Sequence, residues 1–199
     1  MMKFTAITAQ SQSAFTILEP GKHVFFLHNY SGDLTIDIAT PDAEIFIYGI
    51  YIGRNTDHFT LHTTQHHRTG KNISDLLIKG VFFDDSKFLY EGLIQIDPGA
   101  QQSNAYQKNQ NLLLSPNAFV DSRPFLEIKA NDVRCTHGST TGRLNQDQLM
   151  YLDMRGLSAA DAEKVLVEGF VHDVFAKMQE IGCETKSIEE DLFALFLQK

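Results

Sequence analysis

The stretch Leu34–Ile38 reads LTIDI, and its apolar side chains stand at every second position with polar residues between them. Successive side chains of a β-strand point to opposite faces, so this alternation predicts a strand with one buried face. The turn signal Pro41-Asp42 follows, and a second apolar run begins at Ile45. This stretch therefore predicts a short strand, a turn and another short strand.

Short apolar runs of the same kind continue along most of the chain. They are Phe59–Leu61, Leu76–Ile78, Val81–Phe83, Phe88–Tyr90, Leu93–Ile96, Leu112–Leu114 and Phe125–Ile128. Residues such as Gly70 and Gly80 are interpreted as turns between them. The pattern predicts a mainly β body over residues 1–144, and sandwiches, jelly rolls and parallel β-helices all fit it. Because no two-residue Asn-Gly hairpin turn occurs in the body, a right-handed parallel β-helix is favoured.

Helical signals replace the strand pattern in residues 145–199, which we predict to form a small C-terminal helical region. A first helix is expected from Gln146 to Arg155, closed by Gly156. Ser158 begins a second helix as its N-cap, and a third helix is expected from Ser187. From Ser158 to Lys199 nine acidic residues face four lysines, so this region carries −5 of the net charge of −8. An acidic helical surface fits either a solvated face or a docking site for a basic partner.

The composition excludes several classes of protein. Lys and Arg number 17 against 25 Asp and Glu, and this deficit argues against a nucleic-acid-binding protein. No stretch approaches the ~20 apolar residues that span a membrane, and no secretory signal opens the chain. Cys135 and Cys183 are the two cysteines, too few for a disulfide framework and not spaced as a metal motif. A cytoplasmic protein without membrane or nucleic-acid partners is expected.

Four histidines fall within ten residues, at His58, His62, His66 and His67. On one strand the first three share a face, in a row with steps of about 13 Å between Cα atoms. A single metal ion cannot bridge that spacing, since Zn–N bonds are ~2.1 Å. A polar ladder on a β surface is the simpler interpretation, and a metal site of a β-fold enzyme is the alternative.

Cys135 and His137 form the second group with possible chemistry. They are two residues apart, so on a strand they project from one face with Cα atoms about 6.6 Å apart. A thiol and an imidazole so placed suit a soft metal or a reactive thiol with a nearby base. Simple packing of a buried cysteine is the competing interpretation. The glycine-rich stretch Gly138–Arg143 lacks the spacing and the lysine of a phosphate-binding loop, and no nucleotide site is predicted.

From about Leu61 to Phe175 the sequence resembles the SufB/SufD family of iron–sulfur cluster assembly scaffold proteins. The matching residues are Gly80-Val81, Ser86, Phe88, Gly92, Gln107, Asn109, Leu112–Ser115, Pro124, Leu126–Ile128, Asp132–Thr140, Leu149, Tyr151-Leu152, Arg155-Gly156 and Gly169-Phe170. The run Cys135–Gly138 looks like the SufD branch, because a Glu-His-Glu type of sequence is expected there in SufB. Family members usually carry a helical region before the β-helix, so the chain looks like a short form.

The resemblance implies a function and a site. It implies a non-enzymatic scaffold whose C-terminal helices bind a SufC-like ATPase and whose β-helix pairs with a SufB-like partner or with itself as a homodimer. His137, with Cys135 beside it, then lies where an iron–sulfur cluster or iron is held transiently at the partner interface, and no intrinsic cofactor is expected. The SufB cysteine that accepts sulfur would align near Asn109, where this chain has no thiol. The alternatives are a metal-dependent enzyme using residues His58–His67 and a purely structural homodimer.

Overall fold

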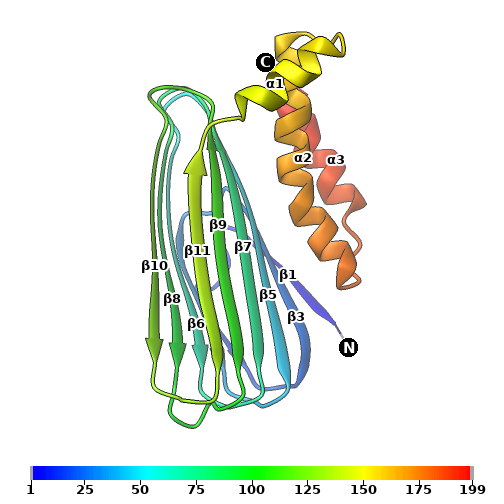
Figure 1. Cartoon of the computed structure of the whole chain (residues 1–199). Helices are drawn as coiled ribbons and strands as arrows, with labels where there is room; N and C mark the ends of the chain where they lie inside the picture. The colour runs from blue at the N-terminus through cyan, green and yellow to red at the C-terminus, as the bar shows by residue number, and fades with distance from the viewer. Residues whose placement is uncertain (1, 198–199) are drawn as a thin grey trace. The chain divides into compact units, whose positions relative to one another are not determined.

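The computed structural model describes residues 2–197, and the chain divides into the units Met1–Gly142 and Arg143–Lys199. The first unit is built of β-strands and the second of α-helices (Figure 1). The strands are β1 (Lys3–Ile7), β2 (Ala14–Ile17), β3 (Gly21–His28), β4 (Gly32–Ile38), β5 (Ala43–Gly53), β6 (His58–His67), β7 (Ile73–Phe82), β8 (Lys87–Ile96), β9 (Asn104–Leu113), β10 (Phe119–Ile128) and β11 (Arg134–Gly142).

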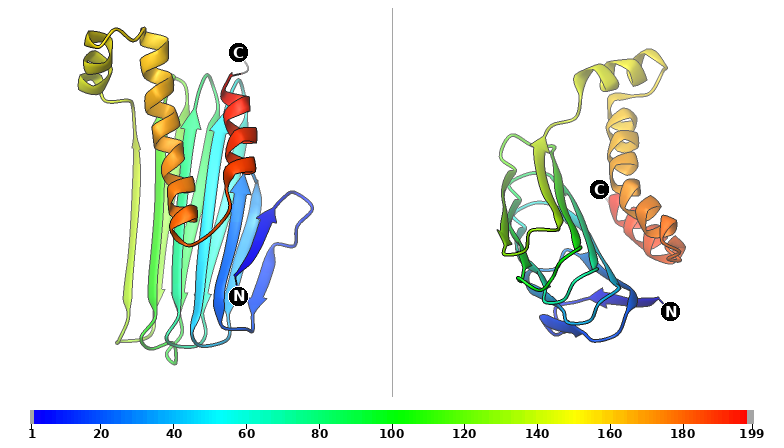
Figure 2. Two further views of the ribbon diagram at one scale, coloured as in Figure 1. Left: turned by 90° about the vertical axis from the view of Figure 1, so that its right-hand side faces the viewer. Right: turned by 60° about the horizontal axis from the view of Figure 1, so that its bottom comes forward.

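Successive strands alternate between two sheets. One sheet has the order β1-β3-β5-β7-β9-β11 and the other the order β10-β8-β6-β4-β2, with every pair parallel. Each turn of the chain therefore adds one strand to each sheet, and Figure 2 shows the resulting two layers of strands. The repeat is 29 residues between His58 and Lys87 and 32 between Lys87 and Phe119. The predicted parallel β-helix is confirmed.

The interior between the two sheets is filled by the alternate side chains that the sequence pattern marks as buried. Leu34, Ile36 and Ile38 are at most 1% exposed. Aromatic rings stack further along, with ring centroids 4.5 Å apart between Tyr51 and Phe88 and 6.1 Å apart between Phe88 and the Tyr90 ring. Removing this apolar surface from water stabilises the β-helix.

Two of the predicted strand boundaries are wrong. Gly80 is not a turn but lies inside β7, and the predicted strands on its two sides form one. A side chain there would meet the carboxamide of Asn111 and the ring of Phe82. Gly80 therefore supplies space inside the β-helix rather than a change of chain direction. Likewise, the runs on either side of Gly92 belong to the single strand β8.

The interior changes from apolar to polar along the β-helix. The inward positions Leu76 and Ile78 of β7 are apolar, whereas their register partners on β9 are Gln107 and Asn109, and Asn111 follows at the next inward position. These three β9 side chains are at most 3% exposed. Burying amides is costly unless they are hydrogen-bonded, so these side chains depend on polar partners inside the last turns.

The helical unit consists of α1 (Gln146–Met154), α2 (Ala159–Glu180) and α3 (Lys186–Leu197). Ser158 is the N-cap of α2, as predicted, and its hydroxyl accepts from the backbone N–H of Asp161. The rings of Phe175 on α2 and Phe193 on α3 lie 6.2 Å apart. Within the described residues, none of the helices combines the length and the apolar character needed to span a membrane.

Candidate functional site

Cys135 and His137 lie on β11, the strand that ends the first sheet. Their register partners on β9 are Ala105 and Gln107, both of which are buried in the interior. The two residues therefore occupy successive inward positions, and the prediction that they share one face is confirmed. Because no strand of the described residues follows β11 in the sheet, the inward side of this last turn is only partly covered.

The Cys135 thiol sits in apolar surroundings. It packs against the cluster of Ile94, Ile96, Ala100 and Ala105, together with Val133. Burial raises the pKa of the thiol, and a hydrogen bond from the Ala105 backbone offsets this only partly. The thiol is therefore neutral at pH 7, and it becomes a thiolate ligand only when a metal displaces its proton.

His137 is exposed, and a buried polar network lies directly behind it. Gln107 Nε2 donates to the carbonyl oxygen of Gly92 at 3.2 Å, and Gln65 Nε2 lies 3.5 Å from Gln107 Oε1. Gly92 permits this crossing, since a side chain at that position would overlap the Gln107 amide. The His137 imidazole thus faces solvent. In the preceding turn of the β-helix, amide side chains rather than apolar ones lie next to it.

Asn109 and Asn111 continue the polar row along β9. The Asn111 amide donates to Asn109 Oδ1 at 2.6 Å and approaches Thr141 Oγ1 on β11 at 3.4 Å. Among the described residues, the buried atoms Asn109 Nδ2 and Asn111 Oδ1 have no hydrogen-bond partner. Sequence reasoning missed this row, since the run Gln107–Asn111 contains no apolar residue although it lies inside β9.

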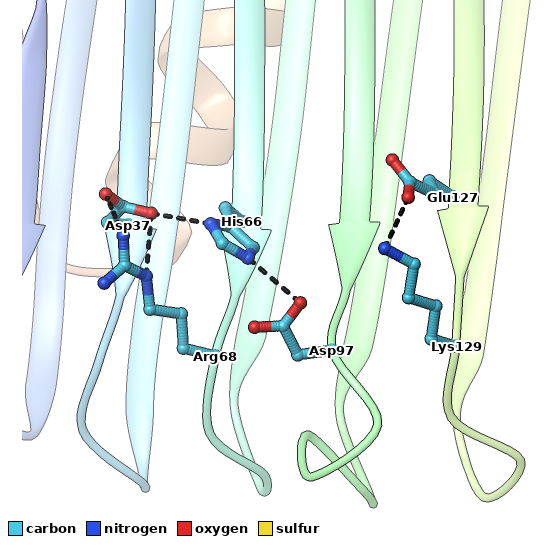
Figure 3. A network of polar contacts seen from close by, with 6 residues as sticks. All are labelled: Asp37, His66, Arg68, Asp97, Glu127 and Lys129. Carbon is cyan, nitrogen blue, oxygen red and sulfur yellow. Dashed lines mark hydrogen bonds and ion pairs between the residues drawn. The ribbon is translucent and has the colours of Figure 1, made fainter.

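The histidine-rich segment occupies β6, and among the described residues it belongs to no group of three or more His, Cys, Asp or Glu placed to hold a metal ion. Outward-facing His62 places Nδ1 2.8 Å from Asp33 Oδ1 on β4, whereas His67 points inward and is fully buried. His66 lies between two carboxylates, with Nδ1 2.7 Å from Asp37 and Nε2 3.2 Å from Asp97 (Figure 3). The row is thus a ladder of polar contacts between neighbouring turns, as the simpler interpretation holds.

Metal-binding capacity is limited on this chain alone. In residues 2–197 no three His, Cys, Asp or Glu side chains are grouped closely enough to hold a metal ion. Cys135 and His137 supply a thiol and an imidazole, which are ligand types that suit iron. Two ligands do not complete a coordination sphere.

The comparison with protein families decides the identity of this fold. The family model for the SUF system FeS cluster assembly, SufBD core domain, matches residues 25–170. The chain belongs to the SufB/SufD family. Its matches to two SufD proteins support the SufD branch: it is 34% identical over 116 residues to the iron–sulfur cluster assembly protein SufD of Escherichia coli and 35% identical over 137 residues to that of Bacillus subtilis.

A SufBD family protein of Synechocystis, slr0076, is 28% identical over 172 residues, which are 85% of this SufBD chain. The E. coli match covers 58% of the chain and the B. subtilis match 68%. The matched parts make up only 27%, 31% and 37% of the lengths of the E. coli, B. subtilis and Synechocystis relatives. The chain therefore corresponds to a core portion of these proteins, and both sheets and the first two helices fall largely within the matched family domain.

Proposed function

We propose that the protein is a SufD-like scaffold subunit of an iron–sulfur cluster assembly complex. In this complex it pairs with another SufBD-family chain, SufB-like or its own copy, and binds a SufC-like ATPase. The observation that carries the proposal is the last turn of a SufBD core, where Cys135 and His137 face inward beside free strand edges. The protein has no catalytic role in this proposal, because it positions ligands and partners.

The proposed cluster site is the seam between the two chains. His137 is exposed and able to bind a metal as a neutral imidazole, and Cys135 lies two residues away on the same face. A partner that covers the last turn would add its own ligands and exclude water from the seam. The nascent cluster is the cargo of this site, so the chain need not hold it when it is alone.

The helical unit is the proposed docking element for the ATPase. Its acidic residues outnumber its lysines, and α1 exposes Met150, Tyr151 and Met154, each more than half exposed. Exposed aromatic and Met side chains are the residue types enriched at protein interfaces. The exposed apolar side chains of α1 fit a partner surface with a small apolar depression, and the acidic excess of residues 158–199 fits a partner with basic residues.

Co-purification tests the partners. The tagged protein expressed in its own host should retain a SufC-like ATPase and a SufB-like chain. Replacing Met150 and Met154 by Asp should release the ATPase and leave the SufBD-family partner bound. Retention of neither protein by the wild-type bait would remove the proposal.

Cluster assembly in cells tests the ligand role. We expect His137→Ala to lower the activity of iron–sulfur enzymes in a strain that depends on this protein. The matched control is His58→Ala, which removes another exposed strand histidine, on β6. Equal activity of the two variants would exclude His137 as a functional ligand.

A further inference from the structure

We propose that the first turn of the β-helix binds an amphipathic carboxylate, a molecule with an apolar tail and one carboxylate group. The tail enters the interior of the turn, and the carboxylate meets the Lys3 ammonium. A hollow of about 330 Å³ opens there, a size within the range of small-molecule sites. It lies against β1, at the opposite end of the first sheet from β11, so the site is separate from Cys135 and His137.

The hollow arises because the first turn of the β-helix is shorter than the turn that follows it. Strand β1 has five residues and β2 has four, whereas β3 has eight and β4 has seven. In residues 2–197 no strand lies beyond β1 in the first sheet or beyond β2 in the second. The short strands therefore leave part of the interior open at this end.

Apolar side chains form the inner part of the hollow. Phe25 on β3 and Ile17 on β2 line it, and both are buried members of the interior core. Phe15 on β2 also lines it and meets Phe25 edge to face, with ring centroids 5.0 Å apart. An apolar tail that enters the hollow leaves water and contacts two aromatic rings, which is favourable.

The Lys3 ammonium stands at the rim of the hollow and already holds a carboxylate. Its Nζ lies 2.6 Å from Glu19 Oε2, and both side chains are more than half exposed. This hydrogen bond and the charge of Lys3 lower the pKa of Glu19. Glu19 therefore shows that a carboxylate is accepted at this place, and the carboxylate of a ligand competes with it for the ammonium.

The positions of the two charged residues favour an anionic ligand over a cationic one. Lys3 is the register partner of His23, which is buried, so Lys3 occupies an inward position of β1. Glu19 instead belongs to the connection between β2 and β3. His23 Nε2 donates to the Glu19 carbonyl oxygen at 3.0 Å, which ties this connection to β3. The cation therefore faces the interior from a strand, and the anion belongs to the rim.

Titration calorimetry of the full chain with octanoate tests the class of ligand. We expect saturable binding of octanoate and about tenfold weaker binding of hexanoate, because hexanoate buries two fewer methylene groups. Octanamide has the same tail without the charge, and we expect it to bind about three- to fivefold more weakly than octanoate. Absence of octanoate binding, or equal affinities for octanoate and octanamide, would overturn the proposal.

Charge variants test the place of the carboxylate. We expect Lys3→Gln to weaken octanoate binding about three- to fivefold, the size of an exposed ion pair. Glu19→Gln should tighten it by a similar factor, because the ammonium loses its competing partner. The matched control is Lys87→Gln, which removes an exposed lysine from the start of β8 and should change nothing. Unchanged octanoate affinity in both Lys3→Gln and Glu19→Gln would place the carboxylate elsewhere and refute the contact.

A filled hollow tests the place of the tail. Thr5 lines the hollow as the register partner of Phe25, so Thr5→Leu puts extra carbon atoms into it. Ala6→Leu makes a matched addition on the other face of β1. We expect at least tenfold weaker octanoate binding for Thr5→Leu and unchanged binding for Ala6→Leu. Equal binding by the two variants would overturn the proposal. Co-purification of the SufB-like and ATPase partners should be the same for wild type and Thr5→Leu, so the scaffold function is tested separately.

Discussion

His67 Nε2 lies 2.8 Å from Ser74 Oγ, and this contact joins the end of β6 to the start of β7 inside the β-helix. Both residues are at most 1% exposed. Burial, together with a smaller effect of the neighbouring His66, lowers the pKa of His67 to about 4. The imidazole is therefore neutral in the folded protein at neutral pH, and its other nitrogen has no partner among the described residues.

We expect His67 to make the protein less stable in weak acid. Below the ordinary pKa of 6.5 the unfolded chain binds a proton that the folded protein does not bind until about pH 4. The free energy of unfolding therefore falls as the pH falls from 6.5 to 4, by roughly 3 kcal/mol in total from this group. Urea unfolding between pH 7 and pH 4 measures the effect, with His67→Gln as the reference. Parallel pH profiles of the two proteins would contradict it.

Gly92→Ala should destabilise the β-helix. The added methyl group would overlap the Gln107 amide and the Tyr90 hydroxyl, both buried. Overpacking of this kind costs about 1 to 3 kcal/mol. Gly99→Ala is the control, because nothing lies within 4 Å of a Cβ atom there. Urea unfolding of the two variants should differ by that amount, and equal midpoints would show that Gln107 does not depend on the space at Gly92.

Asp37→Asn should weaken the ladder shown in Figure 3. The Asp37 carboxylate is 19% exposed and accepts from Arg68 Nε at 3.2 Å and from Nη2 at 2.9 Å, besides its contact with His66. Loss of these charge-assisted bonds should cost about 1 to 2 kcal/mol. Glu127→Gln removes the half-exposed pair with Lys129 and should cost less than Asp37→Asn, because solvent screens an exposed ion pair. A larger loss for Glu127→Gln, measured by urea unfolding, would reverse this order.

Cys135 should react slowly with alkylating reagents at pH 7. Burial raises its pKa, and the thiolate is the form that reacts. We expect iodoacetamide labelling of the folded protein, followed by mass spectrometry of the Cys135 peptide, to be at least several-fold slower than labelling of the same protein in urea. Equal rates in the folded and unfolded states would show that the apolar surroundings do not suppress the thiolate.

Local sequence patterns predicted much of the fold. The alternation at Leu34–Ile38 predicted a half-buried strand, and Ser158 predicted the start of α2, because both signals arise from residues close in sequence. The spacing of two residues between Cys135 and His137 likewise predicted that they share one face of a strand. Gly80 was misread, because a glycine inside a strand and a glycine in a turn look alike until the side chain opposite is known.

The sequence by itself determined the strand period, the helical region, the SufBD family and the two residues that share a face on the last strand. The tertiary structure alone decided that His67 meets Ser74 inside the β-helix and that His66 meets Asp37 across strands. The physical reason is the register of the parallel strands. The strand pairings join residues from 20 positions apart in the first turn to 32 in the last, and the offset depends on how every turn packs on the one before it.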